Sequence, residues 1–119
     1  MKLKYGDMLV MDARNGALSL QLIARGDVPR VEREGRGWSD GATVLLKGAD
    51  AAAFLDVLSG SAGEHEIGDS GLFMEFGYDD LTGRSTLVLF AEGVSVKLTW
   101  AERTLLMYAV RNLAWRLFQ

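Results

Sequence analysis

Apolar residues recur at every second position through most of this chain, and that spacing limits the folds it can adopt. In Ala17–Arg25, for example, leucines at three alternate positions are separated by polar residues. Alternation of this kind indicates a β-strand with one buried and one exposed face. Two stretches, Asp50–Ser59 and Trp100–Phe118, show helical spacing instead. We therefore expect an α+β fold of antiparallel sheets packed with a short central helix and a long C-terminal helix.

Short turn signals, of which Asn15-Gly16 is the strongest, divide the alternating stretches into strands. The expected strands of the first half are Met8–Arg14, Ala17–Arg25, Pro29–Glu34 and Ala42–Lys47. Those of the second half are a short one near Glu66–Ile67, then Leu72–Tyr78, Ser85–Ala91 and Val94–Leu98. Pro29–Glu34 is highly charged, which predicts an edge strand, and Ser85–Ala91 is apolar on both faces, which predicts a central one. One face of the strand Leu72–Tyr78 carries Leu72, Met74, Phe76 and Tyr78.

Both expected helices have recognisable ends. Asp50 is predicted to cap the first helix, and Gly60 to follow its last turn. Thr99 and Glu102 have the spacing of a capping box at the start of the second helix. The second helix has a broad apolar face that is expected to cover the sheets, made of Leu106, Met107, Val110, Leu113, Ala114 and Leu117. Arg103 points the same way, but from the first turn it is expected to reach water.

The two halves of the chain repeat one order of elements, in which strands are followed by a helix. The pseudo-repeats span about residues 5–60 and 66–119, each a β-β-β-β-α unit. Residue identity between them is low, so the repeat is one of architecture. With 119 residues and 49% hydrophobic residues, the whole chain 1–119 is expected to form a single domain.

Composition narrows the classes of function. The net charge is −3, so the chain lacks the strong positive charge that would indicate a nucleic-acid or anionic-membrane partner, although a local basic patch stays possible. The absence of cysteine excludes disulfides, thiolate nucleophiles and Cys-based zinc sites. The N-terminal residues lack a signal-peptide pattern, and the longest uncharged run, Asn15–Ala24, is too short to span a membrane. We therefore expect a cytoplasmic protein with no membrane partner.

The doubled unit resembles one superfamily of nucleic-acid-binding domains. Its members include the plant Whirly proteins, the kinetoplastid mitochondrial guide-RNA-binding proteins, the Pur-alpha repeat and the positive-cofactor coactivators of transcription. The segment VSVKLTWAERTLLMYAVRNLAWRLF is similar to the last strand and helix of a Whirly domain, and ATVLLKGADAAAFLDVL to the first strand-into-helix junction. The Lys-Gly-Lys-Ala-Ala-Leu motif of Whirly proteins is absent, because the comparable stretch Ala17–Leu22 reads ALSLQL. The resemblance implies a homo-oligomer that binds single-stranded DNA or RNA on its sheets.

Binding of single-stranded nucleic acid needs cations for phosphates and aromatic faces for bases. The candidate contacts are Arg14, Arg25, Arg33, Trp38, Phe73 and Lys97, with Arg30, Arg36 and Lys47 as further cations. An alternative is that these are solvated charges on the sheets. Acidic residues at positions 32, 34 and 40 lie among the arginines and would weaken the local potential.

The second helix also predicts a subunit interface. Tyr108, Arg111 and Trp115 lie away from its apolar face, and aromatic residues and arginine are enriched in protein interfaces. The alternative is that the rest of the chain covers them. If the interface is real, a homodimer is the simplest assembly. The alternative function is then a protein-interaction or oligomerisation module that binds no nucleic acid.

The sequence predicts no enzyme and no catalytic, cofactor or metal site. His65 is the single histidine, and its neighbours Glu64 and Glu66 would point away from it in a strand. Asp79-Asp80 is typical of a turn rather than of a catalytic carboxylate pair. The glycine-rich stretches do not match a phosphate-binding loop.

Overall fold

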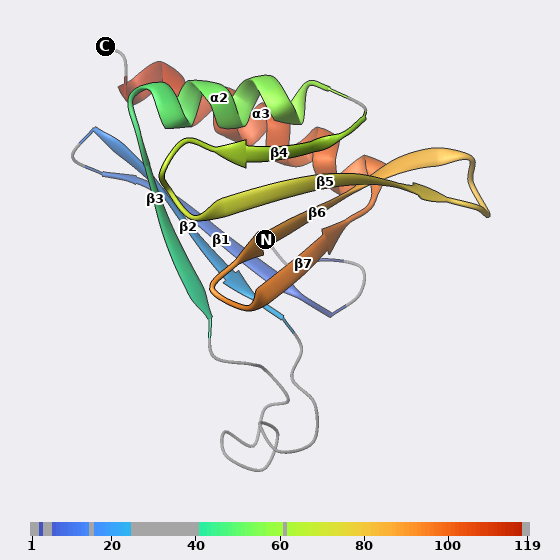
Figure 1. Ribbon diagram of the computed structural model, residues 1–119. Helices are drawn as coiled ribbons and strands as arrows, with labels where there is room; N and C mark the ends of the chain where they lie inside the picture. Colours follow the sequence, from blue (N-terminus) through green and yellow to red (C-terminus); the bar gives the residue numbers. More distant parts are fainter. Residues whose placement is uncertain (1–2, 4–5, 15, 25–40, 61, 118–119) are drawn as a thin grey trace.

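The computed structural model describes residues 3, 6–14, 16–24, 41–60 and 62–117, without the side chains of Arg14 and of residues 114–117. Its elements are β1 (Met8–Arg14), β2 (Ala17–Ile23), β3 (Ala42–Lys47), α2 (Ala49–Leu58), β4 (Glu64–Ile67), β5 (Leu72–Asp79), β6 (Arg84–Ala91), β7 (Val94–Leu98) and α3 (Trp100–Leu117). The described strands form two antiparallel sheets, ordered β1-β2-β3 and β4-β5-β6-β7. The helices lie beside each other over the sheets (Figure 1). The fold is therefore α+β, with the expected short central helix and long C-terminal helix.

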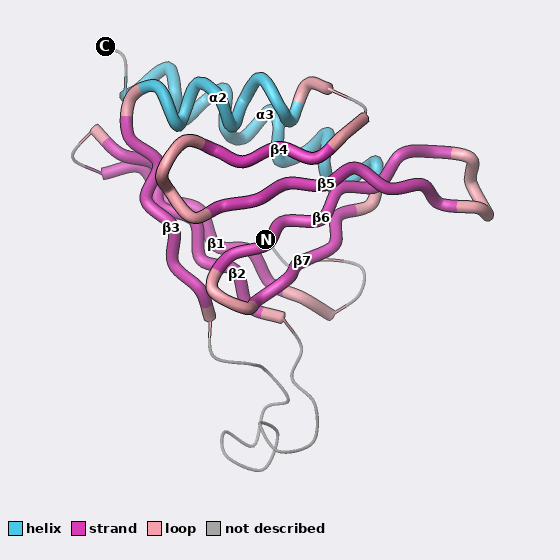
Figure 2. Tube along the Cα trace, in the orientation of Figure 1, coloured by secondary structure: helices cyan, strands magenta, loops and turns pink. Residues whose placement is uncertain are grey.

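The inner faces of the two sheets supply most of the core. The alternating leucines of β2 are at most 1% exposed, and β5 and β6 bury their inner residues in the same way. The largest of these inner residues are Leu18, Leu20, Leu22, Leu72, Met74, Leu87 and Leu89. Strand β2 contacts β7 and β3 contacts β6, so the two inner faces meet although their strands run in different directions (Figure 2). Burial of each such side chain stabilises the fold by roughly 1.5–3 kcal/mol, which is why the alternation decides which face points inward.

The two described helices, α2 and α3, close the core. Phe54 and Leu58 of α2, with Leu106 and Val110 of α3, are at most 2% exposed. Met107 and Leu113 pack against the same cluster. Helix α3 contacts α2 and strands of both sheets. The apolar face predicted for this helix is therefore confirmed over its described side chains.

The two helices begin in different ways. At α3 the predicted capping box is confirmed, because the Thr99 N–H donates to Glu102 Oε1 at 2.8 Å and the Glu102 N–H donates to Thr99 Oγ1 at 3.2 Å. The predicted cap of the first helix at Asp50 is wrong. Helix α2 starts at Ala49, and Gly48 precedes it with φ 50° and ψ −112° and no side-chain hydrogen bond. Residues other than glycine rarely adopt that conformation, so a backbone turn replaces the expected cap.

Several boundaries differ slightly from prediction. Strand β2 ends at Ile23 rather than Arg25. Gly60 follows the end of α2 as expected, but without the positive φ of a left-handed cap. Tyr78 is 68% exposed, because the β5–β6 hairpin extends past the core at its turn (Figure 1). Strand β6 is central in its sheet, as predicted. The expected strand Pro29–Glu34 lies outside the described residues.

Arg103 does not turn to water, contrary to prediction. Its Nη1 donates to the backbone oxygens of Leu58, at 2.8 Å, and of Gly60, at 2.6 Å. Its guanidinium carbon also lies 5.8 Å from the centroid of the Phe76 ring. Carbonyl groups at the end of a helix have no partners within that helix, so Arg103 of α3 completes the last turn of α2. Arg103 therefore links α2 and α3 by hydrogen bonds, in addition to their apolar contacts.

Candidate functional site

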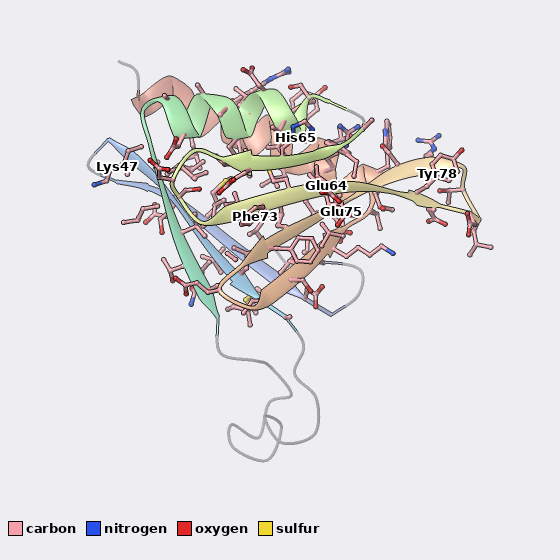
Figure 3. The ribbon with its side chains drawn as sticks, in the orientation of Figure 1. Lys47, Glu64, His65, Phe73, Glu75 and Tyr78 are labelled. Atoms are coloured by element: carbon pink, nitrogen blue, oxygen red, sulfur yellow. The ribbon has the colours of Figure 1, made fainter. Side chains whose placement is uncertain are left out.

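The outer face of the β4–β7 sheet gathers aromatic and acidic side chains. The strand register arranges its residues in two rows, each of which crosses the four strands. The first row is Glu66, Phe73, Phe90 and Ser95, and the second is Glu64, Glu75, Val88 and Lys97. Figure 3 labels Glu64, Phe73 and Glu75 on β4 and β5. We call these eight residues the acidic–aromatic face.

Phe73 and Phe90 form the apolar centre of this face. They stand directly opposite each other on β5 and β6, and they are 49% and 37% exposed. A hollow of about 230 Å³ on one side of the pair is lined by Glu64 and Glu75 among others. A second hollow, of about 420 Å³, is lined by Phe73 and Phe90 together with residues of the β6–β7 turn. Large apolar side chains exposed together are typical of an interaction surface.

Carboxylates border the aromatic pair on the β4 side. Glu64 stands directly opposite Glu75, and Glu66 stands opposite Phe73. All three side chains are exposed. Within the part of the chain that the structure describes, none of them forms an ion pair. Like charges directly opposite each other repel, so this side of the face favours a cation and disfavours a phosphate.

Among the predicted nucleic-acid contacts, the structure describes Phe73, Lys97 and the backbone of Arg14. Phe73 and Lys97 share the acidic–aromatic face but stand in different rows, on β5 and β7. Arg14 ends β1 in the other sheet, and its side chain is outside the described part. The remaining candidates, Arg25, Arg30, Arg33, Arg36 and Trp38, also lie outside the described residues.

Sequence reasoning missed Phe90 and the three glutamates as parts of one surface. Phe90 lies in a strand that is apolar on both faces, so alternation alone gave no signal for its outward direction. The pairing of Glu64 with Glu75 depends on the register of β4 against β5, which the alternation alone does not specify.

The outer face of the β1–β3 sheet is different in chemistry. Its exposed apolar residues are aliphatic, Val10 at 41% and Leu45 at 54%. Asp12 is its single carboxylate among the described residues. The register places Arg14, Ala17 and the exposed Lys47 in one row at the β1–β2 turn. The two cationic positions of this face therefore lie at the same end of the sheet.

Helix α3 presents a third surface. Leu105 and Tyr108 are 62% and 57% exposed, and Arg111 is exposed as well. These residues are spaced by three positions, so they share one side of the helix. Tyr108 is therefore not covered by the rest of the described chain. The side chain of Trp115 lies outside the described part.

His65 and the Asp79-Asp80 pair take structural positions. His65 Nε2 lies 3.0 Å from the Ala62 oxygen, and its ring meets that of Phe76 edge-on at 6.1 Å. Asp79 Oδ1 accepts the N–H of Leu81 at 2.9 Å, which confirms the predicted turn. Among the described residues, no group of three or more His, Asp or Glu side chains is placed to hold a metal ion.

Comparison with known proteins adds no assignment. No family model, no curated protein and no solved structure matches this chain. The resemblance to Whirly-type domains therefore stays a prediction. The described helices include none with the length and apolar character needed to cross a bilayer.

Proposed function

We propose that the chain is a protein-interaction module that binds its partner through the acidic–aromatic face. The observation that carries this proposal is the exposed Phe73–Phe90 pair beside three carboxylates without ion-pair partners in the described chain. Exposed aromatic side chains can act as the binding hot spots of an interface. Charges around them select partners of opposite charge. The same carboxylates oppose the approach of phosphates, so this face suits a protein better than a nucleic acid.

Site-specific photo-crosslinking tests the proposal. Benzoylphenylalanine replaces Phe73 in one variant and Leu45, which is 54% exposed on the other sheet, in the matched control. We expect discrete protein adducts from position 73 that position 45 does not give. A second change, Phe90→Asp, should remove them, because it places a charge in the apolar centre.

Two results would contradict this function. One is the same set of adducts from positions 73 and 45, which would indicate random collision rather than a specific face. The other is a set of adducts at position 73 that nuclease treatment removes, which would indicate a nucleic-acid partner.

We also propose that α3 mediates self-association. Leu105 and Tyr108 supply exposed apolar area on one side of the helix, and Arg111 lies beside them. Light scattering of the chain should then give a mass above the 13.0 kDa of one copy. The double variant Leu105→Glu, Tyr108→Glu should return to that mass. A wild-type mass of one copy at high concentration would rule out this interface.

Single-stranded nucleic acid is the second candidate partner, and the row of Arg14 and Lys47 on the other sheet favours it. Fluorescence anisotropy of a labelled strand of about 30 nucleotides, at low and moderate salt, tests it. We expect saturable binding that weakens with salt and with Lys47→Glu. Absence of binding at low salt would leave only the protein-interaction function.

A further inference from the structure

We propose that the partner of the acidic–aromatic face is an extended peptide segment in which an arginine lies two residues from a large apolar residue. This inference rests on the proposed function, and it specifies the chemistry of the ligand at the same face. The apolar residue would cover the Phe73–Phe90 pair. The arginine would bridge the carboxylates of Glu64 and Glu75.

The carboxylate pair is the first part of the argument. Glu64 and Glu75 stand directly opposite each other on neighbouring antiparallel strands, so their Cβ atoms are about 5 Å apart. Their repulsion is not relieved by any ion pair among the described residues. Lys97 ends the same row, but Val88 on β6 separates it from Glu75. A cation between the two carboxylates would therefore remove an unfavourable interaction as well as add favourable ones.

The type of cation follows from the geometry of the pair. A guanidinium is planar and carries five N–H donors, so it can contact two neighbouring carboxylates at once. An ammonium group is a compact point charge that is more strongly hydrated. Both carboxylates are exposed, so the ligand must reach them from solvent rather than through the core. Arginine is the side chain that matches such a site best.

The spacing comes from the strand that carries both parts of the site. Phe73 and Glu75 are two residues apart on β5, so they point to the same face about 6.8 Å apart. An extended ligand has the same repeat along its own chain. An apolar side chain over Phe73 therefore places the residue two positions away over Glu75. The hollow of about 230 Å³ lined by Glu64, Phe73, Glu75 and Phe90 spans these two contacts.

A titration of the ¹⁵N-labelled chain with three peptides, followed by NMR chemical shifts, tests the inference. The first peptide is acetyl-Thr-Arg-Thr-Phe-Thr-Arg-Thr-amide, which satisfies the spacing in both chain directions. The second has the same composition with both arginines adjacent to the phenylalanine. The third has glutamate in place of each arginine. We expect the first peptide to shift residues of β4 and β5, with an affinity about fivefold higher than that of the second.

Variants then assign the effect to the carboxylate pair. The double variant Glu64→Gln, Glu75→Gln should bind the first and second peptides equally. Asp56→Asn, which changes an exposed carboxylate on helix α2 rather than on this face, is the matched control and should keep the preference. Salt at 1 M should also abolish the preference, because it screens exposed charges beyond about 3 Å.

The outcomes separate this inference from the proposed function. One outcome is that all three peptides shift β4 and β5 equally and that Phe73→Ala removes these shifts. This outcome would overturn the arginine motif but would leave a protein-binding face. No shifts with the first peptide would overturn the motif as well, while crosslinking at position 73 tests the face independently. Shifts confined to the β1–β3 sheet would contradict both.

Discussion

The two halves of this chain build their inner faces alike and their outer faces differently. Leu20 of β2 and Leu89 of β6 are both completely buried. Outward positions carry Leu45 and Lys47 on the β1–β3 sheet, but Phe73 and Glu75 on the β4–β7 sheet. Burial constrains only every second residue of a strand, so the other positions can differ without loss of the fold. One architecture therefore presents two surfaces of different chemistry.

The two halves also differ in how the chain passes from strand to helix. The first half uses the backbone conformation of Gly48, whereas the second uses side-chain hydrogen bonds between Thr99 and Glu102. The second solution has a recognisable sequence spacing. The first has none beyond the glycine itself.

The largest expected effect tests whether the inner faces are equivalent. Leu20→Ala and Leu89→Ala should each lower the free energy of unfolding by about 2–5 kcal/mol, because each leaves a cavity in the shared core. Urea denaturation measures both. If one substitution has little effect on stability, the two inner faces are not equivalent. If fluorescence and circular dichroism give different unfolding midpoints, the two sheets unfold separately and do not share one core.

Arg103 joins the two halves, so its removal should have the next largest effect. Arg103→Ala should lower the free energy of unfolding by about 1.5–3 kcal/mol, because the carbonyls of Leu58 and Gly60 lose a charged donor. Arg103→Lys should recover part of this loss, because it keeps the charge without the planar donor group. Equal losses in both variants would indicate that the hydrogen-bond geometry alone matters.

The two helix starts should respond to different substitutions. Gly48→Ala should lower the free energy of unfolding by about 1–3 kcal/mol, because a φ of 50° with a ψ of −112° is strained for alanine, although no atom lies near its Cβ. Thr99→Ala should cost about 1 kcal/mol through loss of the cap, and Thr99→Ser, which keeps the hydroxyl, should cost less. Thermal denaturation of the three variants would measure these losses of stability. A neutral Gly48→Ala would show that the α2 start does not depend on the glycine conformation.

The smallest expected effect sharpens the contrast between the outer faces. Glu75→Gln should raise the free energy of unfolding by about 0.2–1 kcal/mol, because it removes the repulsion from Glu64. Glu66→Gln is the control, since Glu66 stands opposite Phe73 rather than a carboxylate. The gain should shrink in 1 M salt. A loss of stability on Glu75→Gln would mean that the carboxylate pair is not repulsive.

Local features of the fold were predictable because they depend on residues close together in the chain. The alternation in β2, the capping box at Thr99 and the apolar face of α3 each involve a few neighbouring positions. The predicted cap at Asp50 was wrong. The residue type favoured a side-chain cap there, but the helix starts at Ala49 after a backbone turn at Gly48.

The candidate site was predictable only in part. The outward direction of Phe73 followed from alternation. Helical spacing placed Tyr108 away from the apolar face of α3, but only the structure shows that it is exposed. Phe90 lies in a strand that is apolar on both faces, so alternation did not give its direction, and its position opposite Phe73 depends on the length of the β5–β6 hairpin turn. The predicted cationic contacts are in large part outside the described residues, so they stay a prediction.

The sequence by itself determined that strands such as β2 have one buried face, that the segments of α2 and α3 are helical, and that the chain has no cysteine chemistry, because each of these properties depends on residue types within single segments. Only the tertiary structure decided that Glu64 faces Glu75, that Phe73 faces Phe90, and that Arg103 completes the end of α2. These contacts join residues from different elements. Their partners are set by strand register and helix packing, which depend on the fit of the whole core rather than on any one segment.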